Sequence, residues 1–385
     1  MSRRRESPAS SNANGALEKG SNELQDKHNK IINNFPHLPP YRNPTTGFLS
    51  YLPLPVVPYA QLMRLDKPAG LYAIYLPHII GIVYAACVSP SSTPLSPLLL
   101  LRLAALFVPF NILLRGWACT WNDTLDADFD CLVARCRHRP VARGAVSTAQ
   151  AHTFTAIQLF LFLLLQYYCF PGPSHLYTLT SLVIYGIYPF LKRFTHYPQL
   201  VLGLGIGWSI LFSSAVLLGD DMGRQAVYEL NASKASLALA ASVTIWTVIY
   251  DTVYAHQDIA DDTKAGVKGM AVKLGERTKI LATGLTVIMG VLLVLCGIWS
   301  EEIWSETERV QENKLGGVYF AGTVGGVMAA MGNYLYDVDL KNPASCGAWF
   351  QKQAWLVGGG YLAGLLGEYI LQLQAAGWEY RWTWP

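Results

Sequence analysis

The sequence predicts an all-α integral membrane protein with nine transmembrane helices. Its 385 residues are 52% hydrophobic and only 14% charged, whereas a soluble domain carries about 25% charged residues. Beyond Pro58 lie nine apolar stretches, each long enough to cross a hydrocarbon core about 30 Å thick. Each should be helical, because isolated strands cannot satisfy their backbone groups in lipid. The stretches are 69–89, 97–121, 150–170, 175–192, 199–218, 236–256, 279–299, 316–336 and 354–374.

Residues 1–50 differ in composition from the predicted membrane domain, 51–385. They are rich in Ser, Asn, Pro and charge and have no apolar period, so we expect a disordered polar tail. Acidic residues such as Glu6, Glu18 and Glu23 are not typical of a mitochondrial transit peptide. We therefore expect the endoplasmic reticulum membrane, with the mitochondrial inner membrane as the alternative.

Basic residues indicate the orientation in the membrane. Most of them precede the first stretch or follow the even-numbered stretches, and the positive-inside rule puts these segments on the cytosolic side. The loop after the fifth stretch then lies opposite, where Asn231-Ala-Ser233 is a possible N-glycosylation site. The net charge of +3 is too small to suggest nucleic-acid binding. The expected surroundings are membrane lipid, and we infer no obligatory protein partner.

The end of the second stretch carries a first group of polar residues. Asn122, Asp126 and Asp130 are spaced four residues apart, so in a continuous helix they share one face. Asp123 borders that face. Arg115 projects towards it from inside the apolar stretch. Because a buried arginine is costly unless it pairs, Arg115 marks either a structural ion pair with the aspartates or a substrate contact.

The end of the sixth stretch carries a second group. Tyr254, Asp258 and Asp262 recur every four residues, and Asp251 lies seven residues before Asp258. Both groups follow even-numbered stretches, so both emerge on the same membrane face and can converge on one site. One such group alone is typical of a solvated helix end, but two of them on one face favour a functional site.

Two facing acidic groups repel each other unless cations lie between them. Oxygen ligands alone select hard ions such as Mg²⁺, which keeps waters and is completed by phosphate oxygens. A diphosphate is therefore the expected ligand. Basic donors on the same face are Lys192 and Arg193, together with Arg135, Arg137, Arg139 and Arg143. The rival class is an ion-coupled transporter, in which intramembrane acids bind the coupling ion. Against it, the sequence has no internal repeat, and the acids cluster at two helix ends.

These residues resemble the motifs of the UbiA superfamily of intramembrane aromatic prenyltransferases. The first motif, N-D-x-x-D-x-x-x-D, is matched at 122–130, and the end of the second, D-x-x-x-D, at 258–262. Further similarity covers 64–68, 135–140 and 188–193. The resemblance implies a nine-helix UbiA-type bundle around a central cavity. It also implies two Mg²⁺ ions that hold a prenyl diphosphate between the motifs.

The resemblance suggests roles for individual residues. The metal ligands would be Asn122, Asp123, Asp126, Asp130, Asp258 and Asp262. The catalytic group would comprise Asp123, Asp126, Asp258, Tyr254, Lys192 and Arg193, with the ring of Tyr254 stabilising an allylic cation by about 0.5 to 2 kcal/mol. Substrate contacts would come from Arg64, Arg115, Arg139, Asn122 and Asp251. Arg64 either anchors an acceptor carboxylate or marks the start of the first membrane helix.

Two groups within the superfamily share these motifs. They are the 4-hydroxybenzoate polyprenyltransferases of ubiquinone synthesis and the fungal enzymes that prenylate polyketide-derived aromatic acceptors in meroterpenoid pathways. Three departures favour the fungal group: Cys136 and His138 before Arg139, Val141, and Gly269-Met270 in place of a usual Ser-Thr. We therefore expect Mg²⁺-dependent transfer of a prenyl group, of farnesyl length, to an aromatic carbon.

Overall fold

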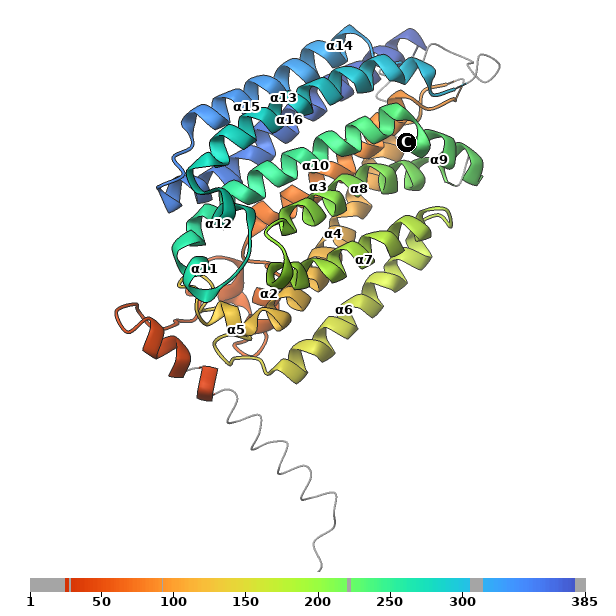
Figure 1. The fold of residues 1–385 in the computed structure, drawn as a ribbon. Helices are drawn as coiled ribbons and strands as arrows, with labels where there is room; N and C mark the ends of the chain where they lie inside the picture. Colours follow the sequence, from red (N-terminus) through yellow and green to blue (C-terminus); the bar gives the residue numbers. More distant parts are fainter. Residues whose placement is uncertain (1–24, 28, 92, 220–222, 305–313, 378–385) are drawn as a thin grey trace, which may run out of the picture.

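Long helices fill the computed structural model, which describes residues 25–27, 29–91, 93–219, 223–304 and 314–377. They run side by side in one bundle, with short helices and loops gathered at one end (Figure 1). The long helices are α3 (Pro68–Cys87), α4 (Pro97–Leu125), α6 (Thr148–Cys169), α7 (Ser174–Phe194), α8 (Pro198–Leu218), α10 (Lys234–Ala255), α13 (Thr278–Trp299), α15 (Gly326–Asp337) and α16 (Pro343–Ala375). Within the described residues, each of the predicted stretches coincides with helical structure.

Local sequence signals explain where these helices begin. Proline occupies the first turn of α3, α4, α8 and α16, where its missing N–H costs no hydrogen bond. At the start of α6, Ser147 and Gln150 form a reciprocal capping box. Within the bundle, α10 packs against α8 and α13, and α3 packs against α8 and α16.

The predicted count of nine membrane spans is not confirmed. Among the described residues, seven helices are long and apolar enough to cross a membrane, and α7 and α15 are not among them. A π-helical segment, η5 (Phe320–Gly325), separates α15 from the short α14 (Gly317–Tyr319). Helix α7 is polar on its packed side, at Ser174, Thr178 and Ser181.

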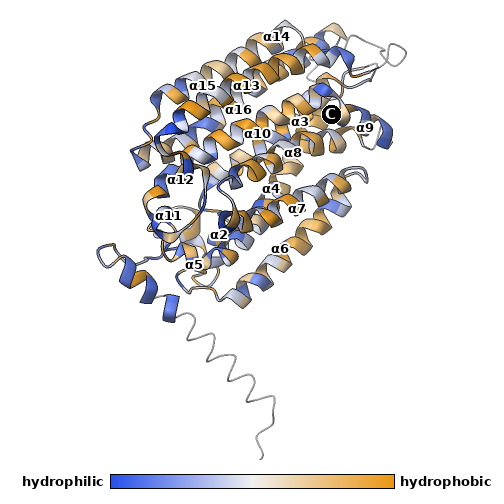
Figure 2. Ribbon diagram, viewed as in Figure 1, coloured by the Kyte–Doolittle hydropathy of each residue, from blue (hydrophilic) through white to orange (hydrophobic). Residues whose placement is uncertain are grey.

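The outer face of α7 is apolar, as lipid exposure requires. Leu176, Leu179 and Phe194 are 69%, 58% and 75% exposed. Figure 2 shows apolar residues along the long helices, and polar colour at the end where α2 (Val57–Leu62) and α12 (Met270–Leu274) lie. This polar end of the bundle carries both predicted motifs.

Part of the predicted polar tail contacts the rest of the chain. Its first 24 residues lie outside the described residues. In the remainder, the carbonyl of Pro39 accepts a hydrogen bond from Arg137 at 3.3 Å. The guanidinium carbon of Arg143 lies 3.8 Å from the ring centre of Tyr41. This part of the tail thus lies against the loop between α5 (Ala127–Asp130) and α6.

The structure gives no support to the predicted glycosylation site. Asn231 lies in α9 (Gly223–Ala232) and is only 5% exposed. Its amide nitrogen, the atom that would carry a glycan, donates a hydrogen bond to the carbonyl of Leu211 at 3.0 Å. The Asn231 side chain is enclosed because α9 folds back onto α8.

Close packing between α16 and the η5–α15 segment depends on glycine. A Cβ atom at Gly364 would lie 2.3 Å from the backbone nitrogen of Thr323.

We predict that Gly364→Ala lowers the midpoint of thermal unfolding in detergent, because overpacking lowers the free energy of unfolding by about 1–3 kcal/mol. Gly359→Ala on the same helix is the control, since nothing lies within 4 Å of its Cβ position. Equal midpoints for the two variants would contradict the prediction.

Candidate functional site

A cavity of about 790 Å³ opens among the helix ends that carry the two motifs. It is enclosed by α3, α4, α7, α8, α10 and α16 together with the loops that join them. The predicted site residues that line it are Arg64, Arg115, Asn122, Asp123, Asp126, Asp130, Arg139, Lys192, Asp251, Tyr254, Asp258 and Asp262. The structure therefore brings the two groups together, although more than a hundred residues separate them in the chain.

The first motif crosses a break between two helices. Helix α4 ends at Leu125 and α5 begins at Ala127, so the continuous helix assumed from the sequence is interrupted at Asp126. The helical hydrogen-bond pattern nevertheless continues, because the N–H of Asp126 donates to Asn122 and the N–H of Asp130 donates to Asp126. The i to i+4 spacing therefore still directs the motif to one cavity.

The second motif also lies at a helix end. Helix α10 is followed by the 3₁₀ turn η2 (His256–Asp258) and by α11 (Ile259–Ala265). Asp258 is only 8% exposed. The ring of Tyr254 packs 4.6 Å from that of Phe350 on α16, and its hydroxyl accepts a hydrogen bond from Arg135 at 3.0 Å.

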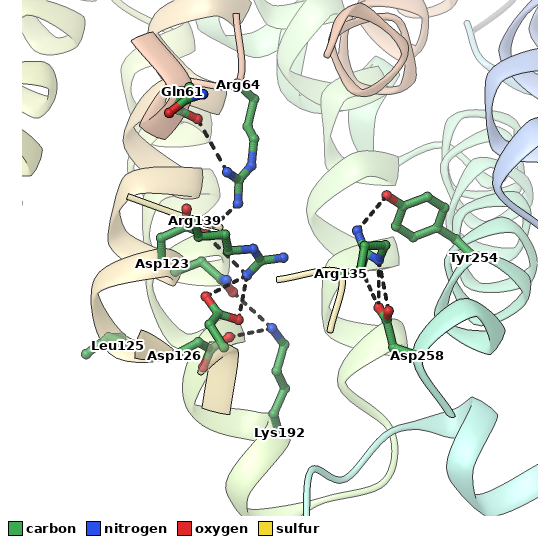
Figure 3. A network of polar contacts seen from close by, with 12 residues as sticks. Gln61, Arg64, Asp123, Leu125, Asp126, Arg135, Arg139, Lys192, Tyr254 and Asp258 are labelled. Carbon is green, nitrogen blue, oxygen red and sulfur yellow. Dashed lines mark hydrogen bonds and ion pairs between the residues drawn. The ribbon is translucent and has the colours of Figure 1, made fainter. Parts of the chain in front are cut away.

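Basic side chains neutralise the carboxylates of the first motif (Figure 3). Asp123 pairs with Arg64 at 2.6 Å and with Arg139 at 3.3 Å. Arg139 also pairs with Asp130 at 2.9 Å. Lys192 pairs with Asp126 at 2.6 Å and donates to the side-chain oxygen of Asn122 at 3.2 Å. These are the donors that a charged ligand would compete for.

The loop of residues 131–147 contacts both motifs. Arg139 reaches the first motif, and Arg135 forms a two-pronged ion pair with Asp258 of the second, its Nε lying 2.9 Å from Oδ1. The backbone N–H of Ala134 donates to Asp261 at 2.9 Å. Arg135 is one of the basic residues expected to serve the diphosphate, but its pairing with the second motif does not follow from the sequence.

Arg115 contacts backbone oxygens and not the aspartates. Its Nη1 donates to the carbonyl of Arg64 at 3.0 Å and its Nη2 to that of Lys67 at 2.9 Å. Arg64 has a φ of 57°, a left-handed conformation that a non-glycine residue rarely adopts. Arg115, 8% exposed, thus fixes the turn from which Arg64 reaches Asp123.

Arg193 does not line the cavity. Its guanidinium donates to the carbonyl of Leu125 at 2.7 Å and lies 4.6 Å from the ring centre of Phe129. These contacts fasten the end of α7 to the end of α4. The neighbouring Lys192 lines the cavity. The two side chains point in different directions because adjacent residues on a helix are about 100° apart around its axis.

The carboxylate group retains unsatisfied oxygens. Within the described ranges, no three His, Cys, Asp or Glu side chains lie close enough to hold a metal ion together. However, Asp123 Oδ2 and Asp126 Oδ1 are buried and have no hydrogen-bond partner. Burial raises the pKa of Asp130 to about 7; Arg139 opposes this shift and the nearby Asp123 adds to it. Unpaired carboxylate oxygens in a buried site fit a bound cation.

Comparisons of the sequence and of the fold with known proteins identify the same family. Residues 74–357 match the UbiA prenyltransferase family. The prenyltransferase ascA of Acremonium egyptiacum is 44% identical over 66% of this chain and 73% of its own length. The prenyltransferase stbC of Stachybotrys bisbyi is 33% identical over 88% of this chain and 94% of its own. The mitochondrial 4-hydroxybenzoate polyprenyltransferase of Homo sapiens is 36% identical over 76% and 71%.

Solved structures share the fold at low sequence identity. A UbiA homologue from Archaeoglobus fulgidus, bound to GPP and Mg²⁺, has a TM-score of 0.57 and is 16% identical, covering 81% of this chain and 99% of that one. The apo UbiA homologue from Aeropyrum pernix has a TM-score of 0.51 and is 20% identical, covering 78% and 96%.

We predict that Arg115→Met releases the turn of residues 63–67. Each of the two hydrogen bonds from a charged donor contributes about 1.5–3 kcal/mol, so amide hydrogen exchange in this turn should accelerate at least roughly tenfold. The measurement is hydrogen–deuterium exchange by mass spectrometry. Arg102→Met, at an exposed position of the same helix, is the control. Identical exchange in both variants would show that Arg115 does not hold the turn.

Proposed function

Since the chain belongs to the UbiA prenyltransferase family, we propose that it transfers a farnesyl group from farnesyl diphosphate to an aromatic carbon. The acceptor would be a polyketide-derived aromatic compound of a meroterpenoid pathway, and the reaction would depend on Mg²⁺. One observation carries this proposal: acidic and basic side chains alternate around a single cavity at a polar end of the bundle.

The acidic side chains suit a divalent cation. The residues that would hold Mg²⁺ are Asn122, Asp123, Asp126, Asp130, Asp258 and Asp262, and the unpartnered oxygens of Asp123 and Asp126 support this assignment. Bound Mg²⁺ would offset the negative charge of the diphosphate and so make it a better leaving group.

The basic side chains suit the diphosphate itself. Lys192, Arg139 and Arg135 each pair with a carboxylate that the cation would take over. Once displaced, they can donate charge-assisted hydrogen bonds to the oxygens of the departing pyrophosphate. Arg193, which binds a backbone carbonyl, is not part of this set.

The inner part of the cavity suits the prenyl chain. Its walls include Ile74, Tyr185 and Leu202, which are apolar or aromatic. Tyr185 precedes Lys192 by seven residues, so it lies about 10 Å deeper along α7. Exclusion of water from such a chamber protects an allylic cation, and the face of the Tyr254 ring would stabilise it by about 0.5 to 2 kcal/mol.

The relatives favour a fungal type of acceptor. Identity to the Acremonium prenyltransferase, 44%, exceeds that to the human 4-hydroxybenzoate enzyme, 36%. The alternative is 4-hydroxybenzoate polyprenyl transfer in the mitochondrial inner membrane. We propose the endoplasmic reticulum membrane, which subcellular fractionation would test. The transporter class has no support from the family match.

Removal of one carboxylate from either motif should abolish prenyl transfer. We predict that Asp126→Ala and Asp258→Ala each reduce turnover by about 10²–10³-fold, because a charge-stabilising group is lost from the site. The assay measures Mg²⁺-dependent transfer of labelled farnesyl to an aromatic acid by membranes. Asp128→Ala is the control, since this exposed acid in the same motif does not line the cavity. Near-normal turnover by either motif variant would contradict the prediction.

A substrate panel should identify the donor and the acceptor class. Membranes are given geranyl, farnesyl or longer polyprenyl diphosphates together with a series of aromatic acids that includes 4-hydroxybenzoate. We expect the highest turnover with farnesyl diphosphate and a substituted, polyketide-type acid. Preference for 4-hydroxybenzoate with a long-chain diphosphate would favour the alternative function.

A further inference from the structure

Asp251 lies in the cavity wall, where the motif resemblance suggests a substrate contact but no chemical step. It lies on α10, seven residues before Asp258. At the helical rise of 1.5 Å per residue, it is about 10 Å deeper in the bundle than the second motif. Arg115 lies at a corresponding depth on α4, seven residues before Asn122. Asp251 therefore lies below the level of the proposed diphosphate site.

The carboxylate of Asp251 makes no hydrogen bond or ion pair with the described part of the chain. The cations whose charge acts on it are Lys192 and Arg135. Both are already bound elsewhere, Lys192 to Asp126 and Arg135 to Asp258. Asp251 is thus a cavity acid whose charge no direct partner offsets.

An unpaired acid within an apolar stretch is costly, which indicates a use for it in the liganded protein. Asp251 lies about 10 Å deeper than Asp258, so neither the diphosphate nor the Mg²⁺ ions of the proposed site are its partner. A prenyl chain offers no hydrogen-bonding group. The remaining ligand of the proposed reaction is the aromatic acceptor, which loses a proton when it is prenylated. An ion pair would hold a carboxylate in its charged form and weaken it as a base, and Asp251 is not held in this way.

We propose that Asp251 is the general base that takes the proton from the prenylated ring carbon. The inference rests on the proposed function. The bond from the allylic carbon to oxygen breaks first, and its electron pair leaves with the diphosphate. A pair of ring π electrons then forms the bond to the allylic cation. The Asp251 carboxylate then removes the proton from the same ring carbon, and the C–H electron pair restores the aromatic ring. The resulting carboxylic acid returns its proton to water.

The test compares the wild type with Asp251→Asn, using farnesyl diphosphate and the aromatic acid with the highest turnover in the substrate panel. The acid is supplied unlabelled and deuterated at the ring carbon that becomes prenylated. We expect turnover to fall about 10²-fold, the low end of the effect of a general base, with the KM for farnesyl diphosphate unchanged. We also expect deuterium to slow the variant but not the wild type, because proton removal becomes the slow step only when the base is absent.

Two further variants complete the experiment. Asp251→Glu keeps a carboxylate and should exceed Asp251→Asn in turnover, and Asp128→Asn should match the wild type. The proposal is overturned by near-normal turnover of Asp251→Asn, by a loss without a deuterium effect, or by a glutamate variant no better than the asparagine one. Failure of the wild type to prenylate any acid of the panel would instead count against the proposed function.

Discussion

Compensation of charge between carboxylates and basic side chains is the constraint on which the polar end of this bundle depends. Asp123, Asp126 and Asp130 lie too close together in a buried site to remain charged without counter-ions. Arg139 is placed between Asp123 and Asp130 and neutralises part of both charges. The helix ends alone do not supply enough cations, so the loop of residues 131–147 folds over the cavity and contributes two arginines.

Under the proposed function, the same compensation would suit a diphosphate that binds together with Mg²⁺. Each basic group would move from a carboxylate to a phosphate oxygen, and the cation would take its former place. The total charge of the site then changes little, which limits the cost of burying the ligand in a low-dielectric chamber. Asp251 stands apart from this exchange, because no basic side chain of the described residues forms an ion pair with it and it lies deeper in the bundle.

Much of this arrangement follows from the sequence, because hydropathy reports where helices contact lipid. The convergence of the two motifs follows from counting membrane crossings, and the cavity contains both groups. The direction of Arg193 does not follow, since it depends on the carbonyl that α4 leaves free at Leu125. The sequence also does not predict that Arg115 binds the backbone carbonyls of Arg64 and Lys67, because these contacts require the left-handed turn at Arg64. Enclosure of Asn231 depends on how α9 folds back onto α8.

The loop of residues 131–147 contacts both the N-terminal tail and the two motifs. Arg135 and Arg139 face inward to the motifs, whereas Arg137 and Arg143 face outward to Pro39 and the Tyr41 ring. The loop is therefore held from both sides. Truncation or fusion close to Tyr41 would remove contacts that support the loop carrying Arg135 and Arg139, without altering any residue of the cavity. We therefore expect the tail and this loop to diverge together during evolution.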